Sequence, residues 1–210
     1  MALSEIELRV LGSLIEKERT TPESYPLSTQ ALVTACNQRT SRDPVTDYHL
    51  QDVLAAVGRL RDRGLAATVQ SVSDRVPKHS HEAAAALDLD DREAAVLAVL
   101  MLRGAQTPGE LRTRTERYVR FDSVGEVEAV LERLAQRRSP LATRLGRGPG
   151  QSQDRWSLAL GEDPDRLAPR VRRPAEPSGR PAPGGGAEER LTALKARVSE
   201  LEARLAELEG

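Results

Sequence analysis

Residues 46–72 read TDYHLQDVLAAVGRLRDRGLAATVQSV, and this stretch decides the fold. One face of a helix is predicted from apolar residues at helical spacing, namely Leu50, Val53, Leu54, Val57 and Leu60. Gly64 then ends the helical pattern, and a short run that tolerates extended backbone follows at 65–72. We therefore expect a helix that begins after Thr46 as its cap and leads directly into a strand.

Two further helices precede this stretch, and a second strand follows it. Ser4 is predicted to begin the first helix, because Glu7 follows at the spacing of a capping box, and Ser28 is predicted to begin the second. A returning strand from Arg75 would complete a β-hairpin. Three helices followed by a hairpin is the order of a winged-helix domain, in which a wing extends the helix-turn-helix.

The same order of elements is predicted a second time, and this repeat is the strongest internal signal. Three further helices are expected to begin at capping residues that a glutamate follows three positions later, namely Asp90, Thr107 and Ser123. A second hairpin is expected over 141–160. The third helices are aligned at a spacing of 77 residues, so that Leu50 and Leu54 correspond to Val127 and Leu131. Each helix trio is expected to bury its own core.

The predicted fold is therefore mainly α with small β-hairpins, in two tandem winged-helix domains over 1–82 and 88–163. Residues 164–187 are rich in Pro, Gly and Arg and are predicted to be a disordered linker. Residues 188–209 carry a heptad pattern that predicts a short coiled coil and a homodimer. The apolar seam of that coil would be Leu191, Leu194, Val198, Leu201, Leu205 and Leu208.

Composition narrows the classes of function only slightly. The chain has 31 basic and 32 acidic residues and a net charge of -1, so a nucleic-acid surface would have to be a local patch. The single cysteine, Cys36, excludes an intrachain disulfide and is interpreted as a small core residue. The N-terminus has no signal-like pattern and no apolar run is long enough for a bilayer, so a cytoplasmic protein is expected. The bias toward Arg, Ala and Gly suggests a GC-rich bacterial source.

Several strings resemble those of a known family. They are Ala31–Arg39 with Arg42–Val45, Arg75–His81, Leu102–Arg112 and Pro149–Gln151. In this order they resemble the segments of the bacterial YceH-like family, over roughly residues 3–160. The resemblance implies tandem winged-helix domains, and it implies no established activity because the family is functionally uncharacterised. The chain departs from the family's pattern at Thr46, where we expect Met, and at His79, where we expect Tyr.

Candidate DNA contacts follow from the winged-helix prediction, because the third helix of such a domain enters the major groove. Gln51 is placed to read adenine, and Arg39 and Arg42 are placed to contact phosphates or guanine. Further phosphate contacts are expected at Arg75, Lys78, Arg112, Arg144 and Arg147. The alternative is a fixed turn over 37–43 with Arg42 paired to a carboxylate, because acidic residues at the start of the third helix would repel DNA.

Two residue types that often mark sites receive structural interpretations here. His79 and His81 alternate on one strand face, but no third metal ligand lies near them in the sequence. The lone tryptophan, Trp156, is predicted to anchor the second wing to the core. No phosphate loop, dinucleotide fingerprint, nucleophile elbow or HExxH string is present, so no cofactor, metal or enzyme activity is predicted.

Two functions remain open at this point. The first is a DNA-binding protein, such as a transcriptional regulator, that acts as a dimer. The alternative is a protein–protein interaction scaffold that does not bind DNA. Neutral net charge and the acidic start of the third helix favour the scaffold, whereas the arginines around the predicted wings favour DNA.

Overall fold

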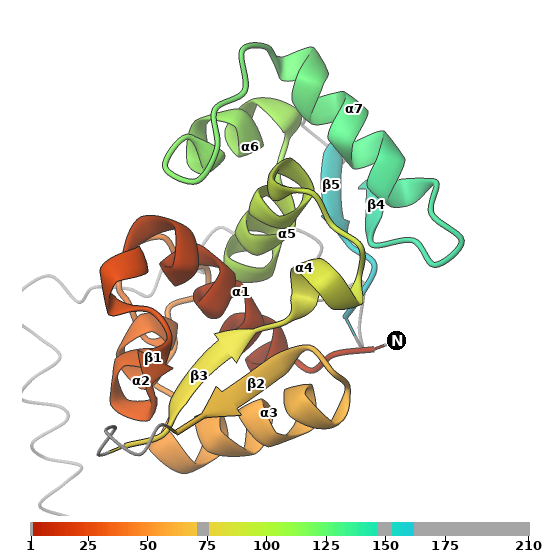
Figure 1. The fold of residues 1–210 in the computed structure, drawn as a ribbon. Coiled ribbons are helices and arrows are strands. Elements are labelled where there is room, and N and C mark those ends of the chain that lie inside the picture. Colours follow the sequence, from red (N-terminus) through yellow and green to blue (C-terminus); the bar gives the residue numbers. More distant parts are fainter. Residues whose placement is uncertain (1, 71–75, 147–152, 162–210) are drawn as a thin grey trace, which may run out of the picture. The chain divides into compact units, whose positions relative to one another are not determined.

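A computed structural model describes residues 2–70, 76–146 and 153–161 (Figure 1). These residues belong to one compact unit, Met1–Pro169. Helices dominate them, and two small antiparallel sheets complete a mixed α/β fold. The predicted linker at 164–187 and the predicted coil at 188–209 lie outside the described residues, so the coiled-coil homodimer stays a prediction.

The first half of the chain, residues 2–86, combines helices with a three-stranded sheet. Its elements are α1 (Glu5–Thr20), the short 3-10 helix η1 (Pro22–Ser24), β1 (Leu27–Ser28), α2 (Thr29–Cys36), α3 (Leu50–Asp62), β2 (Ala66–Val69), β3 (Lys78–His81) and α4 (Ala83–Ala86). The strand order is β1-β3-β2, and both pairings are antiparallel. Ala66 pairs with His81 at the base of the predicted hairpin, whose turn lies outside the described residues.

The second half, residues 90–161, repeats this order with a two-stranded sheet. Its elements are α5 (Asp91–Arg103), α6 (Pro108–Thr115), α7 (Val124–Ala135), β4 (Ala142–Leu145) and β5 (Arg155–Leu158). The strands β4 and β5 are antiparallel, with Ala142 opposite Leu158. A single bridge between Gln106 and Trp156 lies where the first half has β1.

Most of the predicted helix boundaries are confirmed. The Glu7 carboxylate accepts the Ser4 N–H at 2.7 Å, and the Asp90 carboxylate accepts the Glu93 N–H at 2.8 Å. The side chains of the other predicted caps also accept backbone N–H groups, namely Ser28, Thr107 and Ser123. Gly64 follows α3 with a φ of +70°, a left-handed conformation that glycine adopts without steric cost.

The predicted start of the third helix is wrong, because His49 rather than Thr46 is the residue before α3. The Asn37 side chain accepts the Tyr48 N–H at 2.8 Å and donates to the Tyr48 carbonyl at 2.9 Å. These two hydrogen bonds satisfy the backbone of Tyr48 outside the helix. The Thr46 hydroxyl instead donates to the Cys36 carbonyl at 3.4 Å, so it is turned away from the end of α3.

The predicted alignment of the two third helices is also wrong by one helical turn. The caps His49 and Ser123 are 74 residues apart, not 77. At that spacing the buried positions coincide, with Val53, Ala56, Val57 and Leu60 matching Val127, Val130, Leu131 and Leu134. Positions three apart lie near one another on a helix, so the shifted alignment produced a similar apolar pattern. Leu50 and Leu54, which we expected in the core, are 42% and 39% exposed.

The internal repeat extends to a pair of ionic contacts. The capping glutamates Glu7 and Glu93 are 86 residues apart and both are buried. The Glu7 carboxylate lies 3.2 Å from Arg59 and 4.0 Å from Arg63, which come from α3 and its end. The Glu93 carboxylate makes the matching contacts at 3.5 Å and 2.8 Å, with Arg133 and Arg137. These arginines follow the 74-residue spacing, which supports the corrected alignment.

The two helix trios share one hydrophobic core, so the expectation of separate cores is wrong. Helix α1 packs along α5, and Gly12 makes the approach possible. A Cβ atom at Gly12 would lie only 2.9 Å from the Cβ of Met101. The predicted domain boundary between residues 82 and 88 stays a prediction. Of the helices that the structure describes, none combines the length and the apolar character needed to cross a membrane.

Candidate functional site

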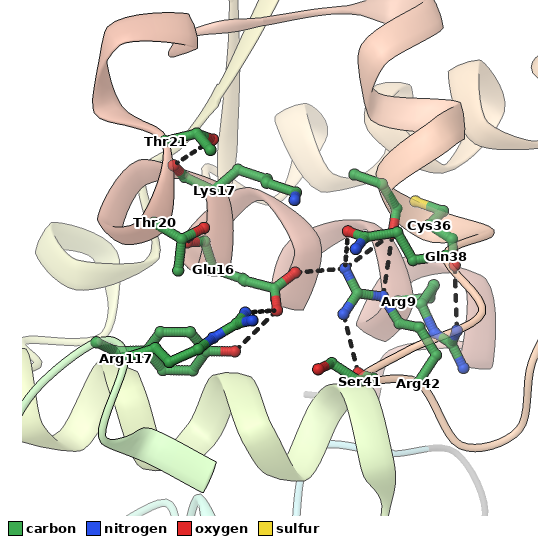
Figure 2. Close-up of polar contacts among 12 residues, drawn as sticks. Arg9, Glu16, Lys17, Thr20, Thr21, Cys36, Gln38, Ser41, Arg42 and Arg117 are labelled. Atoms are coloured by element: carbon green, nitrogen blue, oxygen red, sulfur yellow. Dashed lines mark hydrogen bonds and ion pairs between the residues drawn. The ribbon is translucent and has the colours of Figure 1, made fainter.

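A fully buried ion pair lies where the first half meets the second. Glu16 comes from α1 and Arg42 from the loop between α2 and α3, and both side chains are 0% exposed. Arg42 donates to the Glu16 carboxylate and, at 2.8 Å and 3.0 Å, to the Ala35 carbonyl (Figure 2). It also donates to the Ser41 carbonyl and to Gln38. A buried guanidinium is tolerated only when its donors are satisfied in this way.

The second half completes the surroundings of Glu16. The Tyr118 hydroxyl donates to the Glu16 carboxylate at 2.9 Å, and the Arg117 guanidinium donates to it at 3.3 Å. Burial alone would raise the pKa of Glu16, but the hydrogen bond and charge of Arg42 outweigh it and hold that pKa below its ordinary value. Burial and the negative charge of Glu16 raise the pKa of Tyr118, so its hydroxyl keeps the proton that it donates.

A second buried arginine, Arg9 of α1, fixes the same loop. It donates to the Cys36 carbonyl at 3.1 Å and to the Pro44 carbonyl at 2.6 Å. Burial lowers the pKa of Arg9, and no carboxylate of the described residues lies within ion-pair distance of it. The Asp43 N–H donates to the Leu102 carbonyl of α5. The loop at 37–49 is therefore held by two guanidiniums and by the second half, which fixes the start of α3.

The start of α3 carries an exposed apolar surface, which we call the α3 face. It consists of Val45, Leu50 and Leu54, which are 55%, 42% and 39% exposed. Asp47 and Asp52 are exposed beside it in the sequence, and neither forms an ion pair within the described part of the chain. Contiguous exposed apolar groups are typical of surfaces that bind other proteins. Leu50 and Leu54 are four residues apart on α3, so they are neighbours on its outer side.

The exposed apolar residues are distributed unevenly between the halves. Six large apolar side chains are exposed among the described residues, and five lie in the first half: Val45, Leu50, Leu54, Val69 and Val76. The sixth, Val124, is the first residue of α7 and corresponds to Leu50. One turn further on, α7 has Glu128 where α3 has Leu54. The first half therefore presents an apolar surface that the second half does not repeat.

The DNA-contact residues predicted in the first half differ in how far they are exposed. Arg39 and Gln51 are exposed, and Lys78 is partly buried in β3. Arg42 has no exposed side-chain surface, so the prediction that it contacts a phosphate is wrong in this conformation. The alternative prediction, a fixed turn with Arg42 paired to a carboxylate, is what the structure has. Arg75 lies outside the described residues.

Among the described residues, Arg112 of the second half lies apart from the predicted contacts on α3. Arg112 on α6 is exposed, while α6 and α3 lie at opposite ends of the view in Figure 1. Arg144 is exposed, lies 2.7 Å from the Asp154 carboxylate, and has its guanidinium 6.0 Å from the centre of the Trp156 ring. Arg147 lies outside the described residues.

His79 and His81 are both buried and lie on one face of β3. The ring nitrogens of His79 meet the hydroxyls of Thr29 and Thr68 at 2.9 Å and 3.0 Å. The Nε2 atom of His81 lies 3.0 Å from the Glu18 carboxylate. Within the described ranges, no group of three His, Cys, Asp or Glu side chains is placed to hold a metal ion.

Two core predictions are confirmed. Cys36 is 0% exposed, and burial raises the pKa of its thiol to about 11, so the thiol stays protonated at neutral pH. Trp156 is 4% exposed in β5 and packs into the shared core. Neither residue is available to bind a ligand at the surface.

Sequence reasoning missed the buried ionic groups of α1. Arg9 and Glu16 are seven residues apart, a spacing that places both on one side of a helix. Two opposite charges at this spacing beside an apolar stripe would have been the available signal. No local pattern marked Tyr118, because its partner Glu16 lies 102 residues away in the chain.

The fold and this site define a two-part protein of mixed α/β fold whose halves share one core, and in which the second half contacts a buried ion pair of the first. The chain belongs to a family of bacterial proteins without an assigned function: the family model described as "Protein of unknown function, DUF480" matches residues 3–151. Several curated relatives carry the name UPF0502 protein. The one from Solibacter usitatus is 47% identical over 161 residues, which cover 77% of each chain. The one from Geobacter sulfurreducens is 43% identical over 193 residues, which cover 92% of this chain and 87% of that protein.

Proposed function

We propose that this chain is a protein-interaction module, without catalytic activity, in which two winged-helix domains share a core and the α3 face binds a partner protein. The winged-helix assignment is supported by the repeated order of three helices and a strand pair. It is also supported by the matching contacts of Glu7 and Glu93. The relationship to YceH-like proteins is part of this proposal.

The observation that carries the proposal is the difference between Leu54 and Glu128 at corresponding positions. A solvent-facing position on a helix costs nothing when it is charged, as Glu128 is. An exposed leucine beside exposed Leu50 and Val45 has no such structural reason. The rigid loop before α3 reduces the conformational entropy that binding would otherwise cost. The buried Arg9 and Arg42 thus support a docking function for the surface they position.

The charges around the α3 face indicate the chemistry of the partner. Asp47 and Asp52 would repel the phosphates of DNA, and on α7 the exposed Glu128 and Glu132 would do the same. The same carboxylates would attract lysine or arginine side chains. We therefore expect a partner segment that presents apolar side chains flanked by basic residues, such as a basic amphipathic helix.

The test uses the full chain and two synthetic helical peptides, one of leucine and lysine and one of leucine and glutamate. We expect the basic peptide to bind more tightly in fluorescence anisotropy. The variant Leu54→Glu should weaken this binding at least about tenfold, the scale of losing a buried leucine contact. The matched control Val124→Glu places the same charge at an exposed apolar site of α7 and should leave binding unchanged. Equal binding by both variants, or no preference for the basic peptide, would exclude the α3 face.

DNA binding is kept as a second candidate because of one observation in the second half. Arg112 and Arg120 line the same surface hollow, and Arg120 is 84% exposed. Such a pair suits a phosphate better than the acidic outer surfaces of α3 and α7 do. A homodimer through the predicted coil at 188–209 would duplicate either surface and raise its avidity.

A further inference from the structure

A small polar hollow lies beside α6, on the half of the molecule that does not carry the α3 face. It is lined by Arg112, Thr113, Glu116, Arg120 and Phe121, and its volume is about 260 Å³. Sites for drug-sized ligands occupy about 300–1,000 Å³ and are mostly apolar. This hollow is smaller and its walls are polar, so it suits one small charged group rather than a whole cofactor.

Arg112 provides a fixed guanidinium at this hollow. Its Nε donates to the Phe121 carbonyl at 3.1 Å, and one Nη donates to the Asp122 carbonyl at 2.9 Å. A guanidinium has five N–H donors in a rigid fork, so these two bonds orient it and leave others for a ligand. A pre-oriented fork loses less entropy when it binds an oxyanion.

Arg120 provides a second guanidinium whose only described ion pair is weak. Its Nε lies 3.6 Å from the Asp122 carboxylate, and the two side chains are 84% and 75% exposed. An exposed ion pair of this length contributes little and is readily exchanged for another anion. The hydroxyl of Thr113 has one proton and already donates it to the Gly109 carbonyl. The two arginines are therefore the side chains of the lining that can donate to an anion.

The one acidic side chain in the lining is Glu116. It is exposed, and within the described part of the chain it has no ion pair. Glu116 and the Asp122 carboxylate beside Arg120 offset the two guanidiniums, so an anion with several oxygen atoms binds by replacing the weak contact between Asp122 and Arg120. Glu116 limits the strength of binding, because its charge repels the same anion.

We infer that this hollow, which we call the Arg112 hollow, binds a phosphoryl group. The group is either a free phosphate or one phosphate of a nucleic-acid backbone, since both offer the oxygens that a guanidinium fork recognises. This inference does not depend on the α3 face. It deepens the second candidate function only if the nucleic acid is the source.

Two substitutions with opposite expected effects on phosphate affinity test the Arg112 hollow in the full chain at low ionic strength. Arg120→Ala should weaken the binding of inorganic phosphate, measured by calorimetry, about tenfold, the scale of one charge-assisted hydrogen bond. Glu116→Gln removes the repelling charge and should strengthen the same binding several-fold. Arg138→Ala removes an exposed arginine that does not line the hollow and should change nothing. Arg112 is left intact because its bonds to Phe121 and Asp122 stabilise the turn before α7.

The source of the phosphate is decided with a duplex DNA probe in anisotropy. Duplex binding that inorganic phosphate displaces and that Arg120→Ala weakens assigns the hollow to the nucleic-acid backbone. Phosphate binding without duplex binding assigns it to a free anion. The inference is overturned if phosphate does not bind, or if Arg120→Ala and Arg138→Ala lose affinity equally. Leu54→Glu should leave phosphate binding unchanged, so failure of the docking proposal is recognised separately.

Discussion

Helices α3 and α7 occupy corresponding places in the two halves and differ mainly on their outer sides. Both bury four apolar residues at the same positions and end near arginines that contact a capping glutamate. On the outside, α3 has Leu54 where α7 has Glu128. Packing requirements therefore explain what the helices share. The difference lies on the outer side, where packing does not restrict the residue type and where a partner would make contact.

The loops before these two helices also differ, in the arginines that hold them. The loop at 37–49 is held by Arg9 and Arg42, whereas the shorter turn at 116–123 has Arg112 donating to its carbonyls. At the 86-residue spacing of the first helices, Arg9 and Glu16 correspond to Ala95 and Leu102, which are buried and apolar. Buried ionic groups seldom add stability over apolar ones. At these two positions of the first helix, only the first half has charged groups, which supports a role for them in positioning the α3 face.

The largest expected effect comes from breaking the buried ion pair. Glu16→Gln leaves the buried Arg42 charge without a counterion and should lower the free energy of unfolding by about 3–5 kcal/mol. Urea unfolding followed by circular dichroism measures this change. The double variant with Arg42→Met removes both charges and should recover part of the loss. A Glu16→Gln variant as stable as the parent would show that the ion pair does not contribute to the free energy of unfolding.

The same ion pair predicts how the free energy of unfolding depends on pH in the acidic range. The folded-state pKa of Glu16 lies below the ordinary carboxyl value of 4.5. A carboxyl with a lowered folded pKa contributes stability that is present above its unfolded pKa and is lost as the pH falls through the folded pKa. Stability should therefore decline below about pH 4.5, and the decline should be smaller in the Glu16→Gln variant. Parallel urea titrations at several acidic pH values measure the difference. Identical slopes in the two proteins would contradict the shift.

The accuracy of prediction from sequence differed between local and long-range features. Caps such as Ser4 and Asp90 were predictable because their hydrogen bonds join residues three apart. The alignment of α3 with α7 was not, since a helix pattern shifted by three positions looks almost the same. The partners of Glu16 could not be found, because Arg42 and Tyr118 approach it only through the tertiary fold. Burial of Arg42 removed a predicted DNA contact for the same reason.

The close approach of α1 and α5 gives a smaller effect that compares the halves directly. Gly12→Ala forces a Cβ to within 2.9 Å of Met101 and should destabilise the protein by about 1–3 kcal/mol. Position 98 of α5, which corresponds to Gly12, is already alanine. Gly58→Ala is the control: no atom lies within 4 Å of its added Cβ, so it should stabilise α3 by about 0.5–1 kcal/mol. Thermal unfolding of both variants tests the contrast, and a neutral Gly12→Ala would mean that the helices can separate.

The repeated capping glutamates should give smaller and equal effects. Glu7→Gln and Glu93→Gln each weaken a capping box and an ion pair with partly exposed arginines. Each should cost about 1 kcal/mol, the scale of losing a helix cap. Equal losses in urea unfolding would support the corrected correspondence between the halves. A loss of stability confined to one of the two variants would show that the two halves share the positions of these contacts but not their contribution to stability.

The smallest effect on stability should accompany the largest effect on binding. Leu54→Glu gives α3 the residue of α7, and Glu128→Leu gives α7 the residue of α3. Both sites are exposed, so each change should alter the free energy of unfolding by less than about 0.5 kcal/mol. In the docking proposal, Leu54→Glu loses the basic amphipathic peptide. Glu128→Leu does not create a second site beside Val124, because the second half has Ala95 and Leu102 where the first half has Arg9 and Glu16, which help to hold the loop before α3. Peptide binding gained by Glu128→Leu in anisotropy would mean that a single exposed leucine suffices, and the rigid loop before α3 would then have no part in recognition.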